Sequence, residues 1–401
     1  MHICFASINY HKHQSGGGVG TYVQILGRTL VRLGHKVSVI AFDSDLEGSV
    51  TLDQGVEVYW VRSKEVYLHV SRIPIIGRIL AHAIRELEYS EALFHQARKI
   101  HHLTPIDVIE GIETGGLRLS SLSPEVTTSI RLHGEQFTFD AMTPCYKIGL
   151  HIRLARWIQR KAIRNVDILT APSSTHARLI ESEVGLKDGT VQTIPNPMQM
   201  PNSDKLPPVN TEPSVTFLFV GRIERSKGIL ESLKAFPAIL KEIPNAQLKI
   251  AGRFYPSLSE NLIRNLIQEL DITRHVTFLG HIPRTEMSGF YEKAQVVLAP
   301  SYYEAFGYVY LEALWFGRPL VVFDTGTARD FVQDKVNGII VKCGDIAALA
   351  EGCIQAVKIP ARPQNKGLAY RYDQVKIAMD LLDCYQNRIK KSERPGVIGF
   401  P

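Results

Sequence analysis

The sequence contains few cysteines, and their placement excludes two common uses of this residue. Five occur among 401 residues: Cys4, Cys145, Cys343, Cys353 and Cys384. No two of them form a Cys-x-x-Cys pair. Their odd number and wide scatter argue against both a disulfide framework and a zinc site. We therefore expect a protein of the reducing cytoplasm.

Long apolar runs and a large charge of one sign are also missing. No stretch approaches the ~20 apolar residues that cross a bilayer, and the apolar run in MHICFASINYHKH is too short for a signal peptide. The net charge of +6 does not by itself imply a nucleic-acid partner. With 45% hydrophobic and 21% charged residues, the composition is typical of two or three well-packed globular domains.

Short β-branched runs alternate with amphipathic segments along the first half of the chain. The runs are ICFASI, KVSVIAF, VEVYWV, IDVIE, VTTSIRL and VDILTA. Helical segments are expected at 20–34, 76–100, 146–164 and 174–185. This alternation predicts βαβ units around a parallel sheet with helices on both faces.

Residues 197–213, PMQMPNSDKLPPVNTEP, interrupt this alternation and are typical of an interdomain linker. The alternation then resumes, with further helices expected at 228–242, 258–271, 284–293 and 307–316. We predict an N-terminal domain of residues 1–200, a second α/β domain of residues 201–374, and a last helix, about 375–401, that packs back on the first domain. Ligands of open α/β sheets bind at the carboxyl ends of the strands, so a cleft between the domains is the expected active site.

A glycine cluster follows the first expected strand, in NYHKHQSGGGVGTYV. Gly16, Gly17, Gly18 and Gly20 lead into a helix, where backbone N–H groups can approach an anion. A flexible surface loop is the alternative. A dinucleotide site, with Asp43 on the ribose, fits less well, because several residues separate the strand from the glycines and the third glycine of the GxGxxG spacing is absent.

Two cations follow the first strand of the second domain, in FVGRIERSKGI. Arg222 and Lys227 flank the expected start of a helix, so side-chain charge and helix N–H groups converge at the carboxyl edge of the sheet. This arrangement suits a diphosphate. The alternative is a pair of solvated surface cations.

Two acids stand eight positions apart in SYYEAFGYVYLEALWFGRP. Glu304 is expected in a loop after a strand, and Glu312 inside a largely buried helix that ends at Gly317. A buried carboxylate needs hydrogen-bond donors, which sugar and ribose hydroxyls would supply. Alternatively, Glu312 pairs with a basic residue such as Arg318 or faces water.

The set GGGVGTYV, FVGRIERSKGI, TFLGHI and APSYYEAFGYVYLEALWFGRPLVV resembles the retaining nucleotide-sugar glycosyltransferases of glycosyltransferase family 4. TIPNP before the linker and RYDQV before the last helix extend the resemblance along nearly the whole chain. It implies the GT-B fold, in which two Rossmann-like, doubly wound parallel-sheet domains face each other across a cleft. The first domain would bind the acceptor and the second the nucleotide-sugar donor.

The resemblance also implies roles for particular residues of the second domain. Arg222 and Lys227 would grip the diphosphate and stabilise the charge that grows on it. Glu304 would hold hydroxyls of the donor sugar, and Glu312 those of the ribose. The further donor-binding residues are Arg253, His281, Ser301, Phe306, Gly307 and Tyr308.

In the first domain, the resemblance brings Gly17 and Gly18 against the phosphate and makes His133 a catalytic residue near the transferred sugar. A structural, hydrogen-bonded histidine is the alternative for His133. Glu110 and Glu113, at a strand end in DVIEGIETGG, are candidates for binding the acceptor.

Two segments depart from the family pattern. AGRFYP stands where a second glycine-rich turn is often found, which leaves the choice of base open. In TGTARDF, the acid Asp330 follows a single glycine, Gly326, instead of a glycine pair.

The resemblance implies no metal and no cofactor besides the nucleotide-sugar co-substrate. DSD at 43–45 matches the Asp-x-Asp string of metal-dependent sugar transferases of another fold, and we interpret it as a polar loop. Fixed positive charge at Arg222 and Lys227 would replace the metal. We expect a front-face reaction that retains anomeric configuration, because Glu304 is assigned to sugar hydroxyls and not to nucleophilic attack.

The expected donor is UDP-glucose, with UDP-N-acetylglucosamine and GDP-mannose as alternatives, and the acceptor is a saccharide or lipid-linked saccharide of polysaccharide assembly. The segment YKIGLHIRLARWIQRKAIRN predicts a basic amphipathic helix, which suits the anionic inner face of the cell membrane or a solvated surface. An NAD-dependent oxidoreductase, a non-catalytic nucleotide-sugar sensor and a phosphorylase are the alternative functions.

Overall fold

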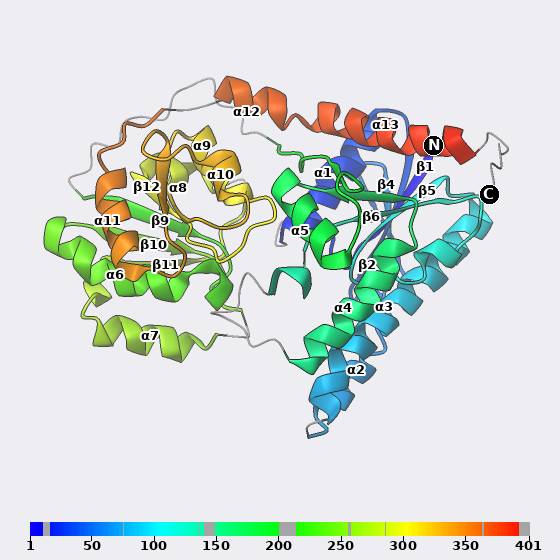
Figure 1. The fold of residues 1–401 in the computed structure, drawn as a ribbon, viewed down its shortest axis with the longest axis horizontal. Coiled ribbons are helices and arrows are strands. Elements are labelled where there is room, and N and C mark those ends of the chain that lie inside the picture. Colours follow the sequence, from blue (N-terminus) through cyan, green and yellow to red (C-terminus); the bar gives the residue numbers. More distant parts are fainter. Residues whose placement is uncertain are drawn as a thin grey trace. The chain divides into compact units, whose positions relative to one another are not determined.

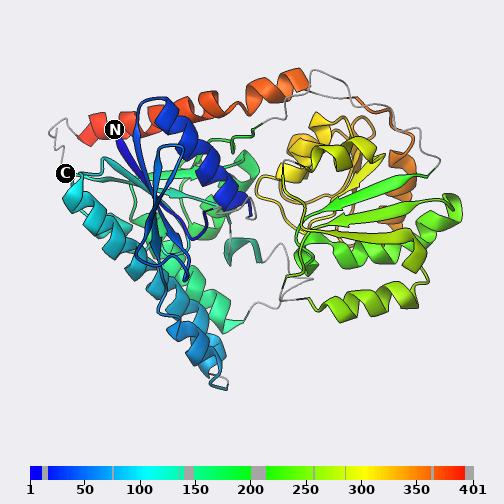
Figure 2. The same cartoon turned by 180° about the vertical axis from the view of Figure 1, so that it is seen from behind.

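The computed structural model describes residues 1–10, 17–74, 76–134, 136–139, 149–199, 214–255, 258–284, 286–362 and 365–392. These residues separate into two compact units. Unit 1 contains the described residues up to Phe139, those from 149 to Gln199 and those from Tyr372 onward. Unit 2 contains the described residues from 214 to Arg371. Figures 1 and 2 show the units from opposite sides.

Unit 1 is built on a sheet of eight strands among its described residues. In spatial order they are β3 (Val50–Asp53), β4 (Val56–Val61), β2 (Lys36–Phe42), β1 (His2–Ala6), β5 (Val108–Ile112), β6 (Thr127–Arg131), β7 (Ile168–Ala171) and β8 (Gln192–Thr193). All neighbours pair in parallel except β3, which runs antiparallel to β4. The inner strands are buried and rich in β-branched residues, as expected of a parallel sheet covered on both faces.

Helices cover both faces of this sheet (Figures 1 and 2). Their bounds are α1 (Gly18–Arg32), α2 (Val66–Ser71), α3 (Ile76–Leu103), α4 (Leu150–Arg164), α5 (Ser174–Val184) and α13 (Gln374–Ser392). Helix α1 packs against α13 on one face, and α3 packs against α4 on the other. Gly27 allows α1 to lie close to the sheet, because a Cβ there would stand 3.3 Å from Cγ2 of Val56.

Unit 2 contains a six-stranded, all-parallel sheet among its described residues. The strands are, in spatial order, β11 (Val276–Gly280), β10 (Gln247–Ala251), β9 (Thr216–Val220), β12 (Val296–Leu298), β13 (Leu320–Phe323) and β14 (Gly338–Val341). Counted along the chain, this is the order 3-2-1-4-5-6 of a doubly wound fold. Its core is rich in phenylalanine and branched aliphatic side chains, such as Phe217, Phe236 and Leu233.

The helices of unit 2 also lie on both faces of its sheet. They are α6 (Ile229–Glu242), α7 (Glu260–Glu269), α8 (Ser288–Lys293), α9 (Tyr308–Trp315), α10 (Ala328–Phe331), α11 (Ile346–Ala356) and α12 (Asn365–Arg371). Helix α6 packs against α11, whereas α9 packs against α10 and α12. The predicted fold class, two α/β domains with doubly wound parallel sheets, is confirmed. The antiparallel strand β3 was not predicted.

Candidate functional site

The candidate site of unit 2 lies where the strand order of the sheet reverses. This point falls between β9 and β12, and ligands of open α/β sheets bind at the carboxyl ends of the strands there. Strand β9 leads into the segment with Arg222 and Lys227, and β12 leads into the segment with Ser301 and Glu304. The fold therefore joins two motifs that lie far apart in the sequence.

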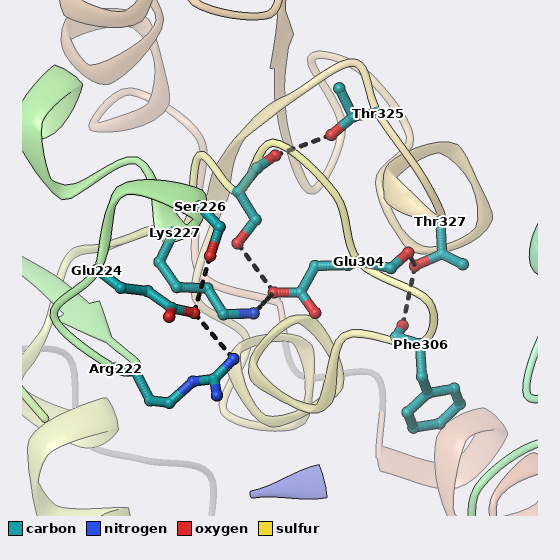
Figure 3. A network of polar contacts seen from close by, with 9 residues as sticks. Arg222, Glu224, Ser226, Lys227, Glu304, Phe306, Thr325 and Thr327 are labelled. Carbon is teal, nitrogen blue, oxygen red and sulfur yellow. Dashed lines mark hydrogen bonds and ion pairs between the residues drawn. The ribbon is translucent and has the colours of Figure 1, made fainter. Parts of the chain in front are cut away.

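An ion pair connects the two segments (Figure 3). Nζ of Lys227 donates a hydrogen bond of 2.6 Å to Oε1 of Glu304, and Oγ of Ser301 donates one of 2.8 Å to the same oxygen. The Lys227 and Glu304 side chains are 22% and 19% exposed, so water screens this pair less than a surface pair. The Ser301 carbonyl in turn accepts from the Thr325 hydroxyl at 2.8 Å. Glu304 is thus held in one orientation.

The loop that carries Glu304 is also fixed through its backbone. The Thr327 hydroxyl donates to the Phe306 carbonyl at 3.0 Å (Figure 3). The Thr327 amide donates to the Glu304 carbonyl at 3.1 Å. Gly326 has φ +52°, and a Cβ there would lie 2.4 Å from the Glu304 carbonyl oxygen. Only glycine permits this close approach. The loop after β13 therefore supports the loop after β12.

The N-terminus of helix α6 comes close to the same place. Gly228, which precedes the helix, has φ +71°, and a Cβ there would lie 2.1 Å from the Pro300 carbonyl oxygen. Lys227 directly precedes this glycine. The first N–H groups of a helix and its dipole favour an anion, so the helix start adds to the positive charge of the lysine.

Other predicted donor-binding residues follow neighbouring strands of the same sheet. Arg253 comes after β10 and His281 after β11, and both side chains are exposed. Slight desolvation, and next the positive charge of Arg253, lower the pKa of His281. Phe306 and Gly307 precede α9, where Gly307 adopts φ +86°. The predicted residues of unit 2 thus gather at one edge of the sheet, and their roles in binding stay predictions.

Glu312 lies inside α9 and is largely buried. It accepts a hydrogen bond of 2.7 Å from the Tyr291 hydroxyl, and its Oε1 lies 3.2 Å from Nη2 of Arg284. Burial and this carboxylate raise the pKa of Tyr291 well above its usual value. The basic partner is therefore Arg284 and not Arg318, which is buried beyond the end of the helix. The role of Glu312 on a ribose stays a prediction.

The glycine segment of unit 1 is described from Gly17 onward, and Gly16 lies outside the described residues. Gly17 precedes α1, and Gly18 is the first residue of that helix. A Cβ at Gly17 would meet no atom within 4 Å, and the φ of −71° is open to any residue. The local fold therefore does not require glycine at this position. Close approach of an anion to the backbone would require it.

His133 follows β6 in unit 1 and packs its ring edge-on against Tyr22 of α1, with 5.5 Å between the ring centroids. Its Nε2 is buried without a hydrogen-bond partner among the described residues. Burial, and next the positive charge of Arg131, hold the pKa of His133 well below its usual value. The imidazole is therefore neutral at pH 7, and its catalytic role stays a prediction.

The two acceptor-side candidates are almost fully buried in unit 1. Glu113 accepts hydrogen bonds from the backbone N–H groups of His133, at 3.0 Å, and Gly134. Glu110 accepts from the Tyr22 hydroxyl at 2.9 Å and from the Tyr385 hydroxyl at 2.7 Å. Both carboxylates thus support the loop after β6 and the packing of α1 and α13. Their binding of an acceptor stays a prediction.

Two further acids that the sequence singled out are Asp43 and Asp330. Asp43 follows β2 in a loop, where its carboxylate accepts from the Asp45 amide at 2.9 Å, as an Asx turn does. Asp330 is an exposed residue of α10. Among the described residues, no three His, Cys, Asp or Glu side chains are grouped as a metal site would require.

Several contributors to the site were not predicted from the sequence. Glu224 lies within a recognised motif, but nothing in its spacing showed that it would pair with Arg222. Arg284 lies outside every motif, so no sequence pattern indicated its contact with Glu312. Thr327 stands beside Gly326 in the segment TGTARDF, and no sequence pattern indicated that it would support the loop of Glu304.

Comparison with known proteins assigns both parts of the chain to glycosyltransferase families. Residues 17–197 match the glycosyl transferase 4-like domain, and residues 203–371 match glycosyl transferases group 1. By its fold and by both matched domains, the chain belongs to the GT-B glycosyltransferases.

Curated relatives share part of the chain. A glycogen synthase of Mycobacterium tuberculosis is 30% identical over 154 residues, which are 38% of this chain and 36% of the relative. An uncharacterised glycosyltransferase of Methanocaldococcus jannaschii is 40% identical over 124 residues, 31% of each chain. A D-inositol 3-phosphate glycosyltransferase of Corynebacterium aurimucosum is 28% identical over 46% of this chain and 47% of the relative. The matched stretches thus span less than half the length of these curated relatives.

Solved structures show the same fold over nearly the whole chain. Sucrose-phosphate synthase from Thermosynechococcus elongatus superimposes with a TM-score of 0.76 at 22% identity, covering 97% of this chain and 99% of that one. HepE from Anabaena, in complex with UDP and glucose, has a TM-score of 0.67 at 18% identity and covers 96% and 99%. At these identities, the likeness establishes the fold.

Proposed function

We propose that the chain is a retaining hexosyltransferase. It moves a hexose from a nucleotide diphosphate sugar, with UDP-glucose as the first donor to test, to a saccharide or lipid-linked saccharide in polysaccharide assembly. The observation that carries the proposal is the meeting of Lys227 and Glu304 at the switch point of unit 2, on the same sheet edge as Arg222. Cations there suit a diphosphate, and a fixed carboxylate suits sugar hydroxyls.

The reaction breaks the bond between the sugar C1 and the oxygen of the β-phosphate, so negative charge grows on the leaving phosphate. Arg222, Lys227 and the N-terminus of α6 would stabilise that charge without moving during the reaction. The acceptor hydroxyl oxygen forms the new bond to C1 on the same face. Its proton passes to the leaving phosphate oxygen, and the nucleoside diphosphate departs. This sequence retains the anomeric configuration.

The contacts of Glu304 favour this front-face course over a covalent intermediate. Its Oε1 already accepts hydrogen bonds from Lys227 and Ser301, which lowers its nucleophilicity and fixes its orientation. The carboxylate remains well suited to accept hydrogen bonds from sugar hydroxyls. The resemblance to the family gives His133 a place near the transferred sugar, and its low pKa would make it a neutral hydrogen-bonding group there.

The names of similar proteins support the choice of donor and product class. The solved HepE structure contains UDP and glucose, and another similar structure is a starch synthase from Arabidopsis thaliana bound to ADP and acarbose. A glycogen synthase is among the curated relatives. UDP-glucose and glucans are therefore the first donor and acceptors to test.

A thermal-shift screen tests the proposal, because a ligand that binds only the folded state raises the melting temperature. We expect stabilisation by UDP and UDP-glucose, followed by transfer to an oligosaccharide or a lipid-linked saccharide. Stabilisation by NAD alone, with a nicotinamide absorbance change, would favour an oxidoreductase. Binding of a donor without hydrolysis or transfer would favour a sensor, and turnover of an α-glucan that requires inorganic phosphate would favour a phosphorylase.

We also propose that unit 1 contacts an anionic membrane surface through α4. Leu150 and Trp157 are 60% and 53% exposed, and the exposed cations Arg153, Lys161 and Arg164 lie along the same helical stripe. Nζ of Lys161 stands 4.0 Å from the centroid of the Trp157 ring. Exposed apolar side chains flanked by cations suit the interface of a bilayer that contains acidic lipids.

Two arginines of α4 do not belong to this exposed surface. Arg156 is buried and Arg160 donates to the Glu183 carbonyl, so neither belongs to the exposed stripe. Helix α2, which packs on α3, also has exposed apolar residues, Val66 and Leu68. The described helices include none that is long and apolar enough to cross a bilayer.

Vesicle sedimentation tests the membrane contact. We expect binding to vesicles that contain phosphatidylglycerol and weaker binding to neutral vesicles, with Leu150→Ser/Trp157→Ser losing most of the difference. Leu52→Ser, at an exposed position of β3, serves as the matched control. Equal binding to both kinds of vesicle would contradict the proposal.

A further inference from the structure

A buried carboxylate that the proposed chemistry does not use lies beneath Arg222. Glu224 is 3% exposed, and its Oε1 lies 2.8 Å from Nη2 of Arg222 (Figure 3). The Ser226 hydroxyl donates a hydrogen bond of 2.8 Å to the same oxygen. One carboxylate oxygen is therefore shared between the cation and the hydroxyl.

Arg222 itself extends into solvent, with a side chain that is 55% exposed. An exposed arginine samples many rotamers, and fixing it on a ligand costs conformational entropy. Here the guanidinium is held by Glu224 and also lies over the ring of Tyr255, 4.9 Å from its centroid. These two contacts restrain the side chain before any ligand arrives.

An acid near a diphosphate site requires an explanation, because it repels the ligand. Unpaired and buried, the Glu224 carboxylate would also be costly. Both costs are offset only while Arg222 stays paired with it. Arg222 must then bind a phosphate without releasing Glu224, which its planar group of five N–H donors allows.

We propose that Glu224 is a positioning residue, which aims Arg222 at the diphosphate of the donor. This inference rests on the proposed function, because it assumes that Arg222 contacts the phosphate. Ser226 orients the carboxylate, and Tyr255 supports the face of the guanidinium. Glu224 itself touches neither phosphate nor sugar.

The inference predicts opposite effects of one substitution in two backgrounds. In the wild-type chain, Glu224→Gln loosens Arg222 and weakens binding of UDP. In Arg222→Ala, the carboxylate has lost its cationic partner and repels the diphosphate, so the same Glu224→Gln change improves binding. A purely structural role of Glu224 would weaken binding in both backgrounds.

A double-mutant cycle tests these opposite effects. Calorimetric titration measures the affinity for UDP of the wild type, of each single variant and of the double variant. We expect Glu224→Gln to weaken UDP binding about fivefold in the wild type, because the glutamine carbonyl still accepts from Arg222 but no longer carries the charge. In Arg222→Ala, it should raise the affinity for UDP. Melting temperatures of all four proteins show that each is folded.

Two controls complete the design. Glu260→Gln removes the acid from another Arg–Glu pair of unit 2, that of Arg264 on α7, and should not change UDP binding. Ser226→Ala keeps the Arg222–Glu224 pair and should weaken UDP binding by less than Glu224→Gln does.

The outcomes separate this inference from the function on which it rests. If the wild type binds UDP and transfers sugar, but Glu224→Gln weakens binding equally in both backgrounds, the positioning role is wrong and the function stands. If neither UDP nor inorganic pyrophosphate binds the wild type, the proposed function itself fails, and the inference fails with it.

Discussion

The ammonium of Lys227 lies 2.6 Å from Oε1 of Glu304, although 77 positions separate the two residues. The lysine follows β9 and the glutamate follows β12, the two strands between which the order of the sheet reverses. The pair is partly buried, and a second donor, Ser301, holds the same oxygen. A cation for a phosphate and an acceptor for sugar hydroxyls are thereby joined in one rigid group.

Replacing Glu304 by glutamine tests its assigned role. Glu304→Gln removes the charge that Lys227 and the sugar hydroxyls share, and we expect kcat/KM for transfer to fall about a hundredfold, a loss of roughly 2.7 kcal/mol. Initial rates with UDP-glucose measure this. Intact-protein mass spectra of the wild type with donor should show no sugar adduct. A glycosyl group on Glu304 would overturn the front-face course.

A substitution at Gly17 tests whether this glycine is needed for donor binding and not for folding. Gly17→Ala should leave the melting temperature unchanged, because the added Cβ meets no atom within 4 Å and φ is −71°. We expect the same variant to raise KM for the donor, since a methyl group obstructs the approach of an anion to the start of α1. Steady-state kinetics and a thermal scan give both values. Unchanged kinetics would remove Gly17 from the site.

Glu312 should affect ligands that contain a ribose and spare those that do not. Glu312→Gln keeps the shape of the side chain but weakens its acceptance of ribose hydroxyls, so binding of UDP should weaken. Binding of inorganic pyrophosphate, which lacks the ribose, is the control and should stay unchanged. Calorimetric titration compares the two ligands. Equal weakening for both would mean that Glu312 acts through its contacts with Tyr291 and Arg284.

The stability of unit 1 should fall as the pH drops below neutrality. Burial, and next the charge of Arg131, lower the pKa of His176 to about 3. The unfolded chain binds a proton near pH 6.5, but the folded chain does not, so stability is lost as the pH falls below that value. At pH 5, about 1.5 units lower, this residue alone removes about 2 kcal/mol.

Denaturant unfolding at pH 7 and pH 5 measures this effect. His176→Gln should reduce the difference in unfolding free energy between the two pH values, whereas His102→Gln, at an exposed position, should not. An undiminished pH dependence in His176→Gln would show that folding does not lower the pKa of His176.

Much of the fold could be predicted because its signals are local. The buried parallel strands are short apolar runs, most of them with β-branched residues, and their alternation with amphipathic segments identifies the doubly wound class. Strand β3 (Val50–Asp53) was missed because it is a mostly exposed edge strand, recognisable only by its pairing with β4. Propensity alone carries little information for such a strand.

Residues of the candidate site could be predicted only where they belong to a motif with characteristic residue types at a characteristic spacing. Arg222, Lys227 and Glu304 each lie in such a motif. The burial of Glu110 was not visible in the sequence, because it depends on Tyr22 and Tyr385 from distant segments. That of Glu113 depends on the backbone N–H groups of His133 and Gly134. Alternation along a strand gives the face of a side chain but not its hydrogen-bond partner.

The central claim is that fixed positive charge after β9 binds the diphosphate of a sugar donor and stabilises it as it leaves. The most direct measurement is the rate of sugar transfer from UDP-glucose by Arg222→Ala/Lys227→Ala, made beside calorimetric titration with UDP and a thermal scan that verifies folding. We predict that UDP binding is lost and that transfer falls at least about a thousandfold. A folded double variant that transfers sugar at the wild-type rate would contradict the claim.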